Sequence, residues 1–129
     1  MKHLTIIFYL LAIPFFISCG QKTSDNKLLS AQEFKNFIDS ADVHLIDVRT
    51  PNEFNQGHIE GALNIDFIAP DFRKQLELLS HDKPIVIYCR TGRRSGLTTK
   101  TLLELGFDEI YDLKYGTMSW QKEGFKLVK

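Results

Sequence analysis

Cysteine is scarce in this chain of 129 residues, which contains only Cys19 and Cys89. Net charge is absent, because 16 basic residues balance 16 acidic ones, so an electrostatic function has to come from local clustering. The bias of disordered or collagen-like chains is also missing, since 43% of the residues are hydrophobic and 25% are charged. The composition therefore predicts one ordinary folded domain and gives no indication of nucleic-acid binding.

No apolar run reaches the roughly 20 residues that a membrane-spanning helix needs. The longest uncharged apolar run covers residues 4–17 and is interrupted by Pro14. Lys2 and His3 precede it, which is typical of a secretory signal peptide. The pattern favours export over a permanent transmembrane helix.

The end of this run, Phe16-Ile17-Ser18-Cys19-Gly20, resembles a bacterial lipoprotein processing site. The resemblance implies cleavage before Cys19, lipidation of Cys19 and a lipid-anchored location in the bacterial cell envelope, periplasmic or exported, with the membrane as a partner. Secretion with a free Cys19 is the alternative, because Phe16 stands where such sites usually carry an aliphatic residue. We expect a lipoprotein-type signal peptide over 1–18, a polar tether over 19–27 and one folded domain over 28–129.

Lipidation of Cys19 would leave Cys89 as the only free thiol, so no intrachain disulfide could form. A lone cysteine in an oxidising compartment is either buried and inert or reactive. The residues around Cys89 favour reactivity, as described below.

Short β-prone runs alternate with segments of helical periodicity along the domain. We predict strands over 43–48, 62–65, 85–88 and 110–113, and helices over 31–40, 51–56, 71–79, 95–105 and 116–123. This alternation predicts an α/β fold, a small parallel sheet with helices on both faces. Ligand sites of such sheets lie outside the carboxyl ends of the strands, where Asp47 and Cys89 fall.

The run Cys89-Arg90-Thr91-Gly92-Arg93-Arg94-Ser95 leads from a predicted strand to a predicted helix. Backbone N–H groups at such a junction can point at one anion, and Gly92 permits the backbone angles that the loop needs. A helix N-terminus and nearby guanidinium groups both favour thiolate over thiol. We therefore predict that Cys89 is a nucleophile on an anion-binding loop.

The same run resembles the active-site loop of single-domain rhodaneses. A second stretch, from Asp47-Val48-Arg49 through Gly57-His58-Ile59 to Asn64-Ile65, resembles another motif of that family. The resemblance implies a sulfurtransferase that moves a sulfane sulfur from a small anionic donor such as thiosulfate to an acceptor through a Cys89 persulfide. The acceptor would be a thiol or a cyanide-like molecule, and a protein can supply the thiol. It implies Cys89 as the catalytic residue and a substrate-binding loop of Arg90, Thr91, Gly92, Arg93 and Arg94. Arg90 and Arg94 would attract the donor.

Other residues of these motifs allow two interpretations. Asp47 and Arg49 either orient the loop or form a structural ion pair at the sheet edge, and the second is favoured. His58 is expected to be structural, because a thiolate activated by its loop needs no general base. Tyr115-Gly116 stands where the family usually has two glycines, so Tyr115 is expected to reshape the rim of the pocket.

Two other functions compete with sulfur transfer. A related phosphatase loop has five residues between cysteine and arginine, whereas four separate Cys89 from Arg94, which favours a cradle for one sulfur atom. A non-catalytic sulfur carrier or interaction module is also possible, because no second cysteine is available to resolve a persulfide. We expect no metal and no cofactor, since the four histidines show no ligand spacing with Cys89.

Overall fold

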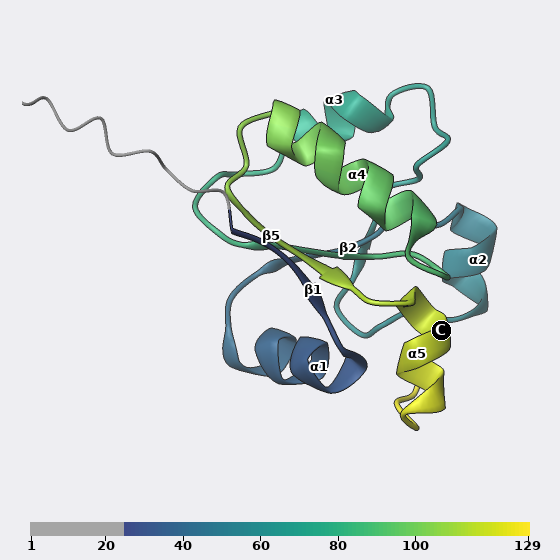
Figure 1. Cartoon of the computed structure of the whole chain (residues 1–129). Coiled ribbons are helices and arrows are strands. Elements are labelled where there is room, and N and C mark those ends of the chain that lie inside the picture. Colours follow the sequence, from purple (N-terminus) through teal and green to yellow (C-terminus); the bar gives the residue numbers. More distant parts are fainter. Residues whose placement is uncertain (1–24) are drawn as a thin grey trace, which may run out of the picture.

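The structure is a computed structural model that describes residues 25–129. Its centre is a parallel sheet of five strands in the order β1-β5-β4-β2-β3 (Figure 1). The strands are β1 (Asp25–Leu29), β2 (His44–Asp47), β3 (Leu63–Asn64), β4 (Ile85–Tyr88) and β5 (Glu109–Leu113). The carboxyl ends of β2 and β4 are therefore neighbours, and this brings the two sequence motifs together.

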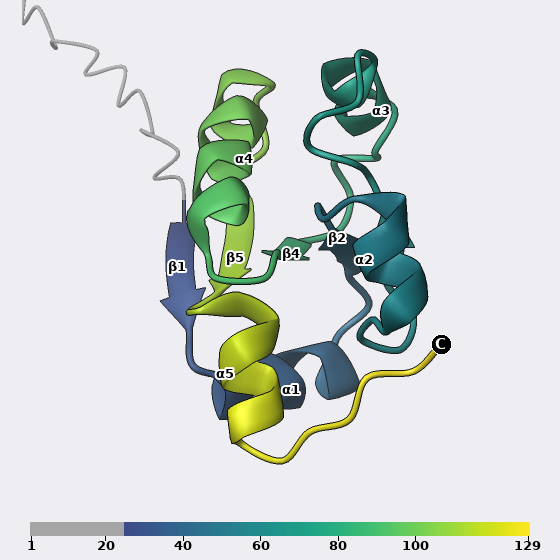
Figure 2. The ribbon, with the colours of Figure 1, turned by 90° about the vertical axis from the view of Figure 1, so that its right-hand side faces the viewer.

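Helices cover both faces of the sheet. They are α1 (Ala31–Ser40), α2 (Pro51–Gln56), α3 (Phe72–Glu77), α4 (Arg93–Glu104) and α5 (Gly116–Lys122). Figure 2 shows α3 and α4 on one side of the strands and α1 and α5 on the other. The predicted fold class, an α/β domain with helices on both faces of a parallel sheet, is confirmed.

The alternation of side chains along β4 divides the core into two parts. Ile85 and Ile87 pack on the side of α3 and α4. Val86 and Tyr88 pack on the side of α1 and α5. All four side chains are fully buried, which explains why β4 reads as an unbroken apolar run.

Capping residues set the start of two helices. Ser30 and Glu33 form a reciprocal capping box at the start of α1. Thr50 and Glu53 form a second box at α2, where Pro51 occupies the first helical position. The second box matters for function, because Glu53 also contacts the cysteine loop.

The main differences from the expected boundaries concern the tether, α4 and α3. The tether expected over 19–27 is wrong at its end, because β1 begins at Asp25 and pairs with β5 along its whole length. The sequence did not predict this strand because its polar residues show no apolar alternation. It is an edge strand, and backbone hydrogen bonds to β5 hold it in place. Helix α4 begins at Arg93 instead of Ser95, and α3 covers only 72–77.

The signal peptide, the first part of the tether and Cys19 lie outside the described residues. Within residues 25–129, no helix has the length and apolar character that crossing a membrane would require.

Candidate active site

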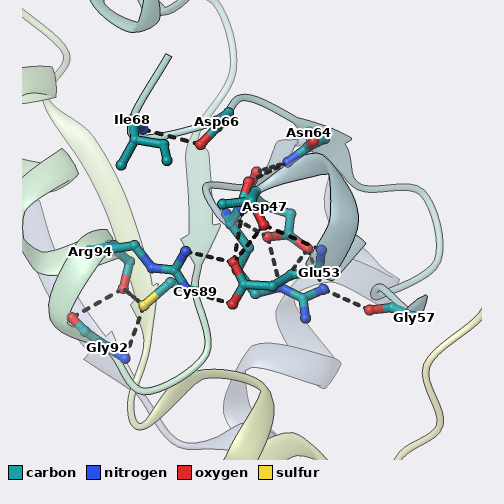
Figure 3. Close-up of polar contacts among 12 residues, drawn as sticks. Asp47, Glu53, Gly57, Asn64, Asp66, Ile68, Cys89, Gly92 and Arg94 are labelled. Carbon is teal, nitrogen blue, oxygen red and sulfur yellow. Dashed lines mark hydrogen bonds and ion pairs between the residues drawn. The ribbon is translucent and has the colours of Figure 1, made fainter. Parts of the chain in front are cut away.

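Cys89 lies directly after β4, at the carboxyl end of a central strand, and its side chain is 1% exposed. Its Sγ accepts hydrogen bonds from the Gly92 N–H at 3.1 Å and from Ser95 Oγ at 3.5 Å (Figure 3). An inert core cysteine would have apolar neighbours only. The polar contacts instead place the sulfur in an environment that stabilises negative charge.

The first turn of α4 supplies that environment. Gly92 is the residue before the helix and adopts a left-handed conformation, with φ of 102°. This conformation turns its N–H toward the sulfur, and a side chain would strain it. Because the helix N-terminus carries partial positive charge, it favours an anion at Sγ.

Arg94 is held by a carboxylate of α2. Its two terminal nitrogens each lie 2.7 Å from one oxygen of Glu53, a bidentate pair between the two motifs (Figure 3). Hydrogen bonds from Arg94 lower the pKa of Glu53 to about 2, against the opposing effect of burial. Glu53 thus compensates the charge of Arg94 in this structure, and the expected attraction of the donor by Arg94 stays a prediction.

The other expected loop residues surround the cysteine in different ways. Arg90, Thr91 and Arg93 are exposed, while Gly92 is half-buried. Arg90 lines a polar cavity of about 460 Å³ beside the loop, which Arg49, Glu53 and Thr117 also line. Arg90 is thus the loop arginine best placed to meet an anion that arrives from solvent.

Asp47 and Arg49 form a buried ion pair. The two side chains meet through several hydrogen bonds, the shortest being 2.7 Å from an Arg49 nitrogen to Asp47 Oδ2. The same Arg49 nitrogen donates to the carbonyl of Gly57 at 2.6 Å, so it fixes the end of α2. The ion pair of the structural interpretation is therefore present, and through Gly57 it contacts the end of the helix that carries Glu53.

The start of α5 closes the site from the other side. The N–H of Thr117 donates to the Cys89 carbonyl at 2.9 Å, and that of Met118 to the Arg90 carbonyl at 3.2 Å. Gly116 permits this approach, because a Cβ there would lie 2.3 Å from the carbonyl oxygen of Cys89. The backbone of the cysteine loop is therefore clamped between α4 and α5.

Tyr115 occupies the position where the sequence predicts an altered rim. It is left-handed, with φ of 63°, and its side chain is 64% exposed. With Thr91 and Met118 it lines an apolar hollow of about 280 Å³ next to the loop. The tyrosine therefore adds apolar surface next to the cysteine loop.

Three residues that sequence reasoning overlooked also shape the site. Glu53 holds Arg94, and its place in the capping box was the available signal. Asn64 donates to the carbonyls of Asp47 and Arg49, at 3.0 and 2.8 Å. Asp112 lies buried on β5 with its pKa raised to about 7 by burial, and no local sequence pattern marks it.

His58 has structural contacts. Its ring stacks on Phe54 with 3.8 Å between centroids, and its backbone pairs in both directions with Val128 at 2.8 Å. The structure thus ties His58 to α2 and to the end of the chain, as expected for a residue outside the chemistry.

The parallel sheet and the buried cysteine at a helix start define an α/β domain of the class that stabilises an anion on a cysteine loop. The chain belongs to the family of rhodanese-like domains, whose family model matches residues 30–123. This match includes both motifs and the start of α5.

The chain is similar to proteins of differing names. It is 42% identical over 94 residues to the uncharacterized protein YqhL of Bacillus subtilis, covering 73% of this chain and 71% of that protein. It is 31% identical over 99 residues to the thiosulfate sulfurtransferase GlpE of Shewanella oneidensis, covering 77% and 96%. A tRNA uridine(34) hydroxylase of Pelagibacter ubique is 29% identical over 111 residues, but the match covers 37% of that protein.

Solved structures agree on the fold. A rhodanese-related protein of Thermoplasma volcanium superimposes with a TM-score of 0.70 at 29% identity, covering 79% of this chain and 97% of that one.

Proposed function

We propose that this chain is a sulfurtransferase that carries a sulfane sulfur as a persulfide on Cys89. The observation that carries the proposal is the position of Sγ at the start of α4, where the Gly92 N–H donates to it at 3.1 Å. The thiosulfate sulfurtransferase of Shewanella oneidensis, which this chain matches over 96% of its length, supports thiosulfate as the donor class. The match to the hydroxylase covers only part of a longer protein, so it supports the rhodanese-like domain and not a hydroxylase activity.

In the first step the Cys89 thiolate attacks the outer sulfur of thiosulfate. A new S–S bond forms, the S–S bond of thiosulfate breaks, and sulfite leaves with its electron pair. The enzyme then holds a persulfide anion. Gly92, Ser95 and the other N–H groups of the loop would stabilise its charge, while Arg90 draws the dianionic donor to the rim.

In the second step a thiophilic acceptor takes the outer sulfur. With cyanide as the acceptor, thiocyanate leaves and the Cys89 thiolate is restored, so no oxidant or reductant is consumed. Cys89 is the only free cysteine among residues 25–129, so within the described domain nothing can resolve the persulfide. The acceptor therefore comes from outside that domain, and we propose that it approaches over the apolar hollow at Tyr115.

The decisive test incubates the full-length chain, in mild detergent, with thiosulfate and then cyanide. We expect Cys89 to gain the mass of one sulfur atom after the first reagent, and thiocyanate to form after the second. Cys89→Ala should abolish both signals, while Cys19→Ser, as a matched cysteine control, should keep both. If no sulfane donor adds sulfur to Cys89, the sulfurtransferase proposal is wrong.

Two other results would redirect the assignment. A single-sulfur gain without thiocyanate would make the chain a sulfur carrier instead of a catalyst. Hydrolysis of an aryl phosphate would indicate a phosphatase, against which two observations stand. Four residues separate Cys89 from Arg94, and Glu53 already holds that arginine at 2.7 Å.

We also propose that Cys19 carries a lipid that anchors the chain in the cell envelope, on the evidence of residues 16–20. Six residue steps separate Cys19 from Asp25, so the lipid would keep β1 within about 20 Å of the membrane surface, given ~3.5 Å per extended residue. Metabolic labelling with an alkyne fatty acid should mark the chain, and Cys19→Ser should remove the label. Labelling that survives this change would refute the assignment of Cys19.

A further inference from the structure

A buried carboxyl group lies behind the cysteine loop. Asp112 of β5 is 2% exposed, and its Oδ1 has no hydrogen-bond partner among residues 25–129. Burial raises the pKa of Asp112 to about 7, and the Ser95 side chain and the Leu113 N–H oppose this more weakly. A buried polar atom without a partner is costly, and the sulfur chemistry described above makes no use of it.

The register of the sheet directs Asp112 and Cys89 to the same face. Asp112 stands next to β4, one position beyond the Val86–Tyr111 pair and opposite Ile87. Cys89 follows Ile87 by two residues, the spacing that returns a side chain to the same face. Ile87 and Cys89 pack in one core cluster with the α4 residue Leu102. Asp112 therefore lies under the start of α4.

Ser95 connects the two groups. It is fully buried in the first turn of α4, and its Oγ donates to Cys89 Sγ at 3.5 Å. The Ser95 side chain also lowers the pKa of Asp112, against the effect of burial, so the hydroxyl and the buried carboxyl are neighbours. The Gly92 carbonyl, at 3.3 Å, is a further acceptor for the same hydroxyl. A hydroxyl has one proton, so Ser95 cannot donate to an aspartate carboxylate and to the sulfur at once.

The protonation state of Asp112 therefore determines where that proton points. A neutral Asp112 donates to Ser95 Oγ and leaves the serine proton for Sγ. An ionised Asp112 accepts the serine proton, because a hydrogen bond to a carboxylate is the stronger one. It also adds negative charge behind a sulfur that must itself be negative to react.

Among residues 25–129, no cation is paired with Asp112. Arg94 of α4 is paired with Glu53, and Tyr88 of β4 faces the opposite side of the sheet. Leu28 stands opposite Asp112 on β1. The remaining described charged side chains on the neighbouring elements are exposed: Lys27, Arg93, Lys100, Glu104, Glu109 and Lys122.

We propose that Asp112 is a positioning residue that acts through Ser95 and that, by its own protonation, controls whether Sγ of Cys89 receives a hydrogen bond. The inference rests on the proposed function of Cys89 as the sulfur-carrying residue. It adds a pH-dependent control that resides on β5, outside both sequence motifs.

The test measures the rate at which iodoacetamide alkylates Cys89, by intact mass, in the full-length Cys19→Ser chain. Rates are compared at about pH 5.5 and about pH 8.5, on either side of the pKa of Asp112, which is about 7. Asp112→Asn keeps the shape and cannot ionise. We expect it to match the parent at the lower pH and to react about tenfold faster at the higher pH, the effect of one hydrogen bond to a charged group.

Ser95→Ala supplies the matched background. It should react about tenfold more slowly than the parent at the lower pH and equal it at the higher pH, where the parent hydroxyl serves the carboxylate. Adding Asp112→Asn to Ser95→Ala should then change the rate by much less than tenfold, because only the charge of the carboxylate is left to act on the sulfur. The proposal is overturned if the parent and Asp112→Asn show the same alkylation rates at both pH values. It is also overturned if Asp112→Asn still speeds alkylation tenfold at the higher pH in the Ser95→Ala background.

Circular dichroism verifies folding, and if Asp112→Asn does not fold, Ser95→Ala decides alone. Equal slowing at both pH values by Ser95→Ala would refute the link to Asp112. Alkylation needs no sulfur donor, so the two proposals fail separately. Separated profiles without thiocyanate formation would refute the sulfurtransferase alone, and turnover with superimposed profiles would refute the control by Asp112 alone.

Discussion

Gly116→Ala is the most stringent test of how the site is held together. Gly116 begins α5 at the point where that helix touches the cysteine loop. An added Cβ would lie 2.3 Å from the carbonyl oxygen of Cys89 and 2.5 Å from the carbonyl carbon of Arg90. Both neighbours are backbone atoms, so no side chain can turn aside. The loop and the helix have to move apart.

The cost can be added from its parts. Gly116 has φ of 57°, and a left-handed conformation costs alanine about 1 kcal/mol. Separation also breaks the hydrogen bonds from Thr117 and Met118 to the loop carbonyls, worth about 1 kcal/mol each. We expect a loss of roughly 3 kcal/mol in the free energy of unfolding, before any strain in the displaced loop is counted.

Urea unfolding measures the loss, and the Cys89-dependent formation of thiocyanate measures the loop. Turnover should fall further than stability alone explains, because the loop holds the Gly92 N–H at the sulfur. Gly96→Ala in α4 is the control, since its added Cβ meets no atom within 4 Å and its backbone is helical. The free energy of unfolding of Gly96→Ala should rise by about 0.5–1 kcal/mol. If Gly116→Ala behaves like this control in both assays, the proposed clamp by α5 does not exist.

Three further predictions concern charge and strain. Tyr115→Gly should raise the free energy of unfolding by about 1 kcal/mol in urea unfolding, because it relieves φ of 63° at an exposed position; a loss would contradict this. Glu53→Gln should destabilise the chain by about 1 kcal/mol above pH 5. The difference in stability between the variant and the parent should vanish as the pH falls from about 4.5 to about 2, because a lowered pKa stabilises the fold only where the carboxyl is ionised in both the folded and the unfolded state. If thermal unfolding shows the same difference in stability at both pH values, the pair with Arg94 is refuted. Between about pH 5 and pH 8, the parent should lose about 2.5 kcal/mol of its free energy of unfolding relative to Asp112→Asn. The reason is that a carboxyl with a raised pKa destabilises the folded state as the pH rises from 3.8 toward 7. Urea unfolding at the two pH values checks this, and parallel losses would argue against a buried ionising carboxyl.

Local patterns explain why most of the fold was predictable. The buried run of β4 has no polar residue, and the Ser30 capping box marks the start of α1. Such signals depend on neighbours within a few residues. Strand β1 escaped prediction because its hydrogen bonds come from β5, some 80 residues later in the chain, and its own residues show no alternation.

Some residues of the site were likewise predictable from local sequence, and others were not. The loop from Cys89 to Arg94 was identifiable because one short stretch combines a strand end, a glycine, a cysteine and arginines. The ion pair of Asp47 and Arg49 was expected, since the two residues are only two positions apart at the end of β2. The partner of Arg94 was not, because Glu53 is brought to it by the pairing of β2 with β4.

By itself, the sequence determined the elements, the parallel α/β class and the cysteine loop, because each depends on residue types at short spacing. Only the tertiary structure decided what compensates each charge and what lies behind the sulfur. Glu53, Gly116 and Asp112 reach the loop from three separate elements. Their effects depend on distances and burial, which chain spacing does not encode. The chemistry of Cys89 depends on the residues of its own loop, whereas the control of its reactivity depends on residues that the assembled sheet brings to that loop.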